Sequence, residues 1–385
     1  MEQRRVYGKN HWYHETQSTI CPVDVLPLVP EAADVEDRFL LDLTLPEAWC
    51  QAHVGWLLPA RRLADTFFPA SVVVNRLHTL SAYDRLSTAL TVAQVYGVQR
   101  LCNHYAARLA PLSGPDSSRE SNRRLAQITQ YARQLASSPS VITALSRSQL
   151  DEVGLTPRDI ILINQIIGFI GFQARTIATF HALMGFPVRW MPGMPQQDDA
   201  LAEVFSADPV DWQPDVNETE WRYADDERLA LLASCQPHSG FAELAPLLAT
   251  HEAVFKTQNT LLGRLHDLQP HAASMALLSA RINGSASCFN AWMQTDAQSA
   301  ALSALLRHDD NALTQWGKIH PDEYALLQAA QLLTRAPARL SAAQLTPLIE
   351  QGLSPREIID ILAWCGLCGW INRLKIALGN VHQQT

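Results

Sequence analysis

The chain has 385 residues, enough for two ordinary domains; 47% are hydrophobic and 18% are charged, as in a well-buried globular protein. A formal net charge of −8 without a basic stripe argues against a nucleic-acid partner. Seven cysteines, an odd number, and an N-terminus without an apolar run behind its basic residues indicate a reducing compartment. We therefore expect a cytoplasmic protein with mostly free thiols.

Membrane insertion is also not expected. The two longest apolar stretches, residues 160–172 and 361–371, are shorter than the roughly 20 residues that a membrane span needs. Both stretches follow helix-capping signals and are amphipathic in context. We read them as core helices.

Four segments follow one another along the chain. Residues 1–35 form a polar, proline-rich arm, residues 36–185 a first helical half, residues 186–228 a connector rich in proline and acids, and residues 229–385 a second helical half. Apolar residues recur at helical spacing nearly everywhere after Val35, and strand-like alternation is almost absent, so we predict an all-α fold. Three tryptophans predict that the connector packs against the rest of the protein, namely Trp190, Trp212 and Trp221.

One pattern occurs three times. A leucine precedes a serine or threonine with an acid three residues later, a long apolar segment follows, and an arginine stands twenty residues after the leucine. The hydroxyl and the acid form a capping box, which predicts a helix start at each copy. We expect the arginines to make structural ion pairs. The copies run from Leu80 to Arg100, from Leu155 to Arg175 and from Leu353 to Arg373.

Aligning these copies suggests a tandem duplication. Gly168 then stands opposite Gly366, and, more loosely, Gly97 opposite Gly284. We predict two similar halves packed with internal pseudo-two-fold symmetry. Because a glycine inside a helix costs about 1 kcal/mol relative to alanine, close contact between the helices of the two halves must compensate.

The third copy contains the only C-x-x-C motif, Cys365 and Cys368, which is typical of a redox dithiol. Two observations favour an apolar core position instead. The pair lies about three turns past its helix cap, too far for the helix dipole to lower a thiol pKa. The sister copy also has Ile167 and Ile170 at the same positions. Both interpretations stay open at this point.

A second candidate is Cys288, at the end of an Asn-Gly-Ser-Ala-Ser-Cys segment. Its small neighbours predict an accessible thiol, and Arg281 or Ser285 are candidates to stabilise the thiolate. The alternative is a lone buried cysteine, which is common in protein cores. The thirteen histidines lack metal-ligand spacing and no phosphate-binding or dinucleotide motif occurs, so we predict neither a metal nor a cofactor.

Together, the repeated helix and the Asn-Gly-Ser-Ala-Ser-Cys segment resemble the AhpD-like superfamily of alkylhydroperoxidases and carboxymuconolactone decarboxylases. The resemblance implies an all-α protein that assembles as a homo-oligomer. In the peroxidase members one cysteine attacks the hydroperoxide, a second resolves it, and a glutamate and a histidine relay protons. Cys288 matches the attacking position, whereas other residues replace the remaining three, namely Ser285, Ala273 and Trp292.

The leading hypothesis is therefore a peroxidase-type oxidoreductase. Its Cys288 thiolate would reduce an organic hydroperoxide and would be recycled by a cellular thiol or by another cysteine, for which Cys365 and Cys368 are the candidates. The alternative is a non-catalytic binding or scaffold protein that keeps the fold and has lost the complete site. The distance of Cys288 from the C-x-x-C pair decides whether a two-cysteine scheme is possible.

Overall fold

A computed structural model of the chain describes residues 28–188, 196–205, 211–216, 226–235, 240–268, 270–293, 295–308 and 311–381. The prediction of an all-α fold is confirmed, since these residues are predominantly helical. The sheet among them is a single antiparallel pair, β1 (Trp212–Pro214) and β2 (Gly379–Val381).

The helices of the first half are α1 (Glu47–Ala52), α2 (Val54–Phe67), α3 (Ala82–Tyr96), α4 (Gln99–Leu109), α5 (Arg119–Ser137), α6 (Ala144–Glu152) and α7 (Pro157–Leu183). After the connector come α8 (Asp226–Ala233), α9 (Ala245–Leu248), α10 (Glu252–His266), α11 (Ala272–Asn283), α12 (Ala286–Trp292), α13 (Ala297–His308), α14 (Ala312–Ile319), α15 (Pro321–Arg335), α16 (Ala342–Glu350) and α17 (Pro355–Leu378).

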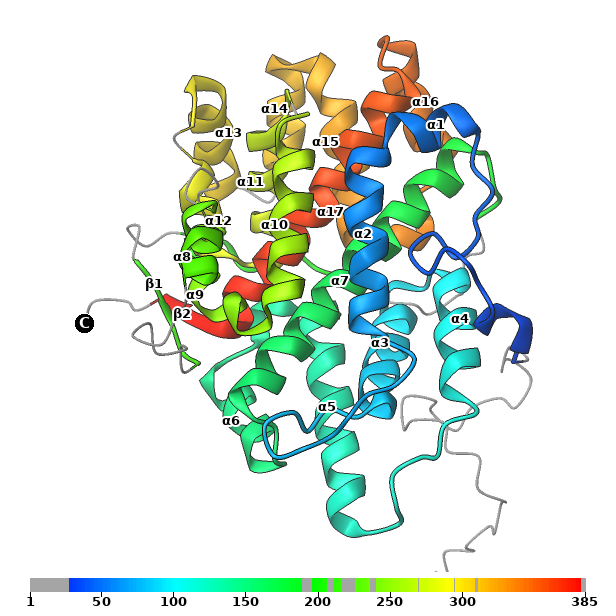
Figure 1. The fold of residues 1–385 in the computed structure, drawn as a ribbon. Helices are drawn as coiled ribbons and strands as arrows, with labels where there is room; N and C mark the ends of the chain where they lie inside the picture. Colours follow the sequence, from blue (N-terminus) through cyan, green and yellow to red (C-terminus); the bar gives the residue numbers. More distant parts are fainter. Residues whose placement is uncertain are drawn as a thin grey trace, which may run out of the picture.

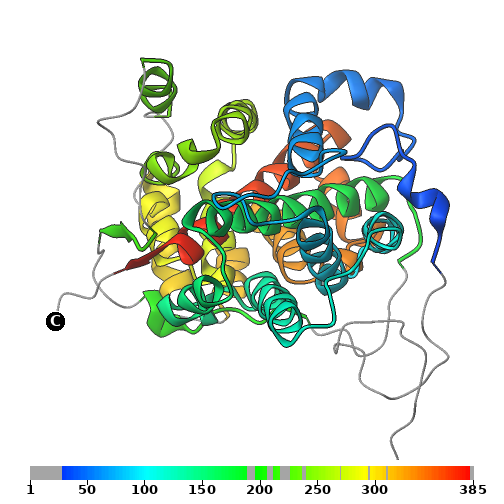
Figure 2. The same ribbon diagram turned by 60° about the horizontal axis from the view of Figure 1, so that its bottom comes forward.

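Helices α7 and α17 run side by side through the middle of the molecule, and the other helices surround them (Figures 1 and 2). Their mutual contact is the most extensive between any two elements described. By length and composition alone each could cross a membrane, but their most apolar windows are 100% and 89% buried inside the protein. Burial of this kind is typical of the core helices of a globular protein.

Glycines allow the close contact between α7 and α17, as the sequence predicts. A Cβ atom built on Gly168 would lie 1.8 Å from Cδ1 of Trp370, so the indole of α17 packs directly on the backbone of α7. The corresponding Gly366 is less crowded, because a Cβ there would lie 3.4 Å from Cδ2 of Phe172. The contact therefore depends more on one glycine than on its counterpart.

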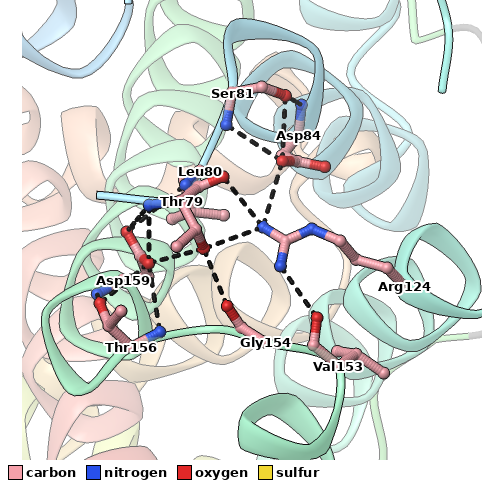
Figure 3. A network of polar contacts seen from close by, with 9 residues as sticks. All are labelled: Thr79, Leu80, Ser81, Asp84, Arg124, Val153, Gly154, Thr156 and Asp159. Carbon is pink, nitrogen blue, oxygen red and sulfur yellow. Dashed lines mark hydrogen bonds and ion pairs between the residues drawn. The ribbon is translucent and has the colours of Figure 1, made fainter. Parts of the chain in front are cut away.

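All three predicted helix starts have capping boxes, at Ser81, Thr156 and Ser354. Hydrogen bonds connect the first two capping boxes (Figure 3). Asp159 of the second box accepts hydrogen bonds from the backbone and the hydroxyl of Thr79, at 2.9 and 2.8 Å, next to the first box. Arg124 of α5 donates to the Thr79 carbonyl at 3.1 Å and also contacts the first box. This network fixes the starts of α3 and α7 together.

Among the described residues the repeated arginines form no ion pair, so this expectation is wrong. Arg175 of α7 donates to the carbonyl of Thr334 at 2.7 Å, near the end of α15, and Arg373 of α17 donates to the carbonyl of Ala136 at 3.0 Å, in α5. Arg100 also donates to a backbone carbonyl. The last carbonyls of a helix carry the negative end of its dipole, so they can hold a guanidinium without a carboxylate. Each long helix is thereby tied to the other half.

The two halves place similar elements in the same order. A 3-10 helix, Pro139–Val141, precedes α6 and α7, and another, Pro337–Arg339, precedes α16 and α17. The buried hydrophobic residues form one cluster that runs through both halves. The duplication, its pseudo-two-fold symmetry and the four segment boundaries stay predictions.

The connector packs against the second half through Trp212, which is buried. Its indole nitrogen donates to the carbonyl of Lys375 at 2.8 Å, and its strand pairs with the segment that follows α17. Packing of the connector is thus confirmed at this tryptophan. Trp190 and Trp221 lie outside the described residues.

Candidate active site

The structure brings two of the three predicted cysteines together. Cys288 of α12 and Cys368 of α17 line the same cavity, whose volume is about 220 Å³. Cys365, one turn earlier in α17, does not line it; its sulfur lies 3.5 Å from the hydroxyl of Thr334 in α15. All three are free thiols. Of the C-x-x-C pair, Cys368 therefore faces the cavity, whereas Cys365 packs against α15.

A tight turn brings Cys288 to this place. Helix α11 ends at Asn283, and Gly284 follows with a φ of 83°, a left-handed conformation that favours glycine. A Cβ atom on Gly284 would also lie 2.7 Å from Cβ of Ser140 in the first half. The turn lets α12 start at once, and its first turn carries Cys288 toward α17.

The cavity has an aromatic wall and a few polar groups. The His266 ring lies 5.5 Å from that of Trp364 and 6.0 Å from that of Trp292, all three at the cavity. Thr295 also lines it and is exposed, so the cavity reaches the surface there. An apolar site of this kind suits the organic part of a small substrate.

Of the two interpretations of Cys288, the buried cysteine is confirmed and the thiol accessible from the outer surface is not. The residue is 4% exposed, because α12 packs it against α17. Arg281 does not face it either, since its guanidinium donates to the carbonyls of Leu306 and Ala200. A reagent therefore reaches the thiol through the cavity and not from the outer surface.

Lys375 is the cation that acts on Cys288. Burial raises the pKa of the Cys288 thiol, whereas Lys375 and Ser285 lower it and Glu243 raises it. Lys375 is itself buried; its ammonium pairs with the carboxylate of Glu243 and lies 4.2 Å from the ring centre of Trp212. Burial lowers the pKa of Lys375, and the Cys288 thiolate and Glu243 raise it. The thiol and the amine thus favour each other's charged forms.

Burial holds the two cysteines of α17 as neutral thiols, and the net pKa of Cys288 is likewise above its ordinary value. Burial raises the pKa of Cys365, although Thr334 and Arg175 lower it. Burial also raises the pKa of Cys368 well above its ordinary value, and the charges of Cys365 and Cys288 raise it further. The effect of Cys288 on the pKa of Cys368 agrees with their common cavity. Cations act on two of the three thiols, Lys375 on Cys288 and Arg175 on Cys365, but of these two only Cys288 lines the cavity.

Sequence reasoning missed Lys375 and Glu243. One signal was available for the lysine, because it stands in an otherwise apolar helix with Asn372 and Arg373, and charged residues are rarely buried without a role. Nothing comparable marked Glu243, which lies far away in the chain. Among the described residues no group of three or more histidines, cysteines or acids is placed to hold a metal ion.

No family model matches this chain, and a search of curated proteins finds no match. The resemblance to the AhpD-like superfamily therefore stays a prediction from the residues quoted above.

Proposed function

We propose that the protein is a cytoplasmic, thiol-dependent peroxidase of the AhpD-like type in which Cys288 attacks an organic hydroperoxide and Cys368 resolves the oxidised sulfur. One observation carries the proposal: the two cysteines line one cavity, and Lys375 acts on Cys288. Cys368 thus takes the part of the resolving cysteine that Ser285 replaces in the family pattern. The aromatic wall fits the organic group of the hydroperoxide.

In the first step the Cys288 thiolate attacks the terminal oxygen of the hydroperoxide. A sulfur–oxygen bond forms, the oxygen–oxygen bond breaks, and the departing alkoxide takes a proton and leaves as an alcohol. Cys288 is then a sulfenic acid, oxidised by two electrons. Cys368 attacks this sulfur, a disulfide forms and water leaves. Two molecules of a cellular thiol reduce the disulfide and become one disulfide themselves.

Lys375 and Glu243 take over the charge and proton roles in this scheme. The ammonium stabilises the Cys288 thiolate and can donate a proton to the departing alkoxide. The Glu243 side chain pairs with this ammonium and is 54% exposed, so it connects the buried lysine with solvent. A lysine and a glutamate would thereby replace the family's histidine and glutamate, whose positions are Trp292 and Ala273 here.

The rival function is a non-catalytic binding or scaffold protein. It is favoured by a different observation, since burial raises the pKa of all three cysteines. This function predicts thiols that react slowly with every oxidant, and a cavity that only binds.

The test uses purified protein with cumene hydroperoxide and dithiothreitol. The peroxidase proposal predicts turnover that falls by about two orders of magnitude or more in Cys288→Ser, because the attacking sulfur is lost. Cys368→Ser should accumulate a sulfenic acid that a dimedone probe captures. Cys365→Ser is the matched control, one helical turn away and outside the cavity, and should keep its turnover within about twofold.

Unchanged turnover in Cys288→Ser would remove this residue from the mechanism. No turnover in the unmodified protein, together with slow labelling of every thiol, would favour the binding function. Sedimentation of the same samples measures the homo-oligomer that the resemblance implies.

A further inference from the structure

Each cysteine of the cavity has a tryptophan one helical turn away. Trp292 follows Cys288 by four residues in α12, and Trp364 precedes Cys368 by four residues in α17. Residues four apart in a helix share a face, and all four of these line the cavity. The two indoles also meet, with ring centres 6.0 Å apart and planes at 77°. An aromatic wall therefore lies one turn away from the pair of thiols.

One indole holds this wall in place, and the rings beside it are open to a ligand. Trp364 is 1% exposed, and its indole nitrogen donates to the carbonyl of Ala272 at 3.0 Å. It packs edge to face against both Trp292 and His266. Trp292 and His266 are only partly buried, so their rings form the accessible part of the wall. Rings fixed in this way favour an aromatic partner, which can stack on them or meet them edge to face.

The size of the cavity limits the ligand to one ring with a short substituent. Its volume is about 220 Å³, whereas an apolar cavity of about 150 Å³ holds benzene. The remaining space suits a short branched carbon with a peroxy group. A long acyl chain exceeds this volume, and a small alkyl group leaves much of the aromatic wall uncovered.

The side chains that line the cavity favour a neutral ligand. Among the described residues, none of those at the cavity is an aspartate, a glutamate, a lysine or an arginine. A carboxylate carried into such a place loses its hydration without gaining a partner, which is costly. A fatty-acid hydroperoxide would therefore have to leave its carboxylate outside, beyond the exposed Thr295.

We propose that this cavity selects neutral aryl hydroperoxides, in which one aromatic ring stands on a short branched carbon that carries the peroxy group. The ring lies against Trp292 and His266, and the terminal peroxy oxygen faces Cys288. This inference rests on the peroxidase function proposed above. It adds the class of substrate and assigns Trp292 as the residue that selects it.

The first test compares kcat/KM for cumene hydroperoxide, tert-butyl hydroperoxide and linoleic acid hydroperoxide. We expect cumene hydroperoxide to exceed each of the other two at least about tenfold. Trp292→Leu should lower the ratio of cumene to tert-butyl hydroperoxide about fivefold, whereas Trp292→Phe keeps an aromatic face and should keep this ratio within about twofold. The matched control is Trp49→Leu, at a partly buried tryptophan of α1 outside the cavity, which should react as the unmodified protein does.

A binding experiment needs no turnover and so separates the two proposals. Calorimetric titration of the full chain with 2-phenyl-2-propanol, the alcohol formed from cumene hydroperoxide, should show one site. We expect this alcohol to bind at least about tenfold more tightly than tert-butanol or dodecanoate, and about fivefold more weakly in Trp292→Leu.

A protein that binds the alcohol in this way but turns over no hydroperoxide would support the aryl site and contradict the peroxidase function. Equal kcat/KM for cumene and linoleic acid hydroperoxides would overturn the aryl proposal. So would a substrate ratio that is unchanged in Trp292→Leu, or dodecanoate binding as tightly as the alcohol.

Discussion

The turn at Gly97 in the first half and the turn at Gly284 in the second half share a backbone conformation, but they lead to different surroundings four residues later. Both glycines are left-handed, with φ of 69° and 83°, and both separate two helices by a short link. Aligning them puts Leu101 at the position of Cys288. Leu101 is fully buried, whereas Cys288 opens on a cavity with a second thiol.

In the first half, the segment around Phe39 packs against α7. Phe39 is fully buried and its ring lies 5.5 Å from that of Phe172 in α7. Tyr105 donates to Gln173 at 2.7 Å, and Gln173 donates in turn to the carbonyl of Phe39 at 2.8 Å. In the second half, aromatic side chains line the cavity without closing it. Among the described residues, the same frame thus gives a packed core where the segment at Phe39 covers it, and a cavity lined by two thiols at Cys288.

The largest expected effect is a difference in stability between alanine variants of the two glycines in the central helix pair, Gly168 in α7 and Gly366 in α17. Gly168→Ala should lower the free energy of unfolding by about 3 kcal/mol or more, because the new methyl group overlaps the indole of Trp370. Gly366→Ala, its counterpart, has room and should change stability by at most about 1 kcal/mol, in the stabilising direction. Urea unfolding of both variants measures the difference. Equal losses would mean that the two halves make equivalent contacts at this axis.

The helix starts provide the second comparison. Asp159 is 1% exposed and joins two capping boxes through Thr79, whereas Glu357 is exposed and contacts its own cap, Ser354. Asp159→Asn should therefore cost about 2–3 kcal/mol, since it leaves buried donors facing an amide. Glu357→Gln should cost about 0.5–1 kcal/mol, the usual range of an exposed cap. Thermal unfolding checks both, and a larger loss in Glu357→Gln would contradict the network of Figure 3.

Tyr105→Phe tests whether the hydrogen bonds through Gln173 hold the Phe39 segment against the first half. We expect a loss of about 1–2 kcal/mol, because the Gln173 carbonyl loses its buried donor. Hydrogen exchange should also become faster in residues 38–43. Tyr131→Phe is the control: it removes a similar bond, to Asn164, at 2.9 Å. Tyr131→Phe should cost about as much stability without changing hydrogen exchange in residues 38–43. Faster exchange there in Tyr131→Phe would mean that Gln173 does not hold Phe39 in place.

The smallest expected effect concerns the rate at which Cys288 reacts. Lys375 lowers the pKa of this thiol and Glu243 raises it. Lys375→Met should therefore shift the pH profile of Cys288 alkylation to higher pH and slow the reaction at pH 7 several-fold. Glu243→Gln should shift the profile to lower pH and accelerate it. Shifts of the same sign in both variants would exclude the proposed pairing.

Local signals predicted the frame of the molecule. The capping boxes at Ser81, Thr156 and Ser354 gave the helix starts, because a cap depends on neighbours in the chain. The glycine spacing predicted the contact between α7 and α17. The repeated arginines misled, since backbone carbonyls replaced the expected carboxylates and no local pattern distinguishes the two.

The candidate site was predictable only in part. Cys288 and the C-x-x-C pair were identified from their motifs, but the motifs left the place of Cys288 against α17 and the cavity undecided, because α17 comes from far along the chain. The same holds for Lys375 and Glu243, which meet across 132 residues. Phe39, which packs into the first half, belongs to a segment next to the predicted boundary between the N-terminal arm and the first helical half. Each of these features depends on long-range packing and not on local spacing.

The most direct test of the cysteine pair is peptide mapping under non-reducing conditions after one equivalent of cumene hydroperoxide. The proposed mechanism predicts a disulfide between Cys288 and Cys368, absent before treatment, and a sulfenic acid at Cys288 when Cys368 is replaced by serine. A protein in which Cys288 stays a free thiol, or in which Cys365 and Cys368 alone become linked, would contradict it.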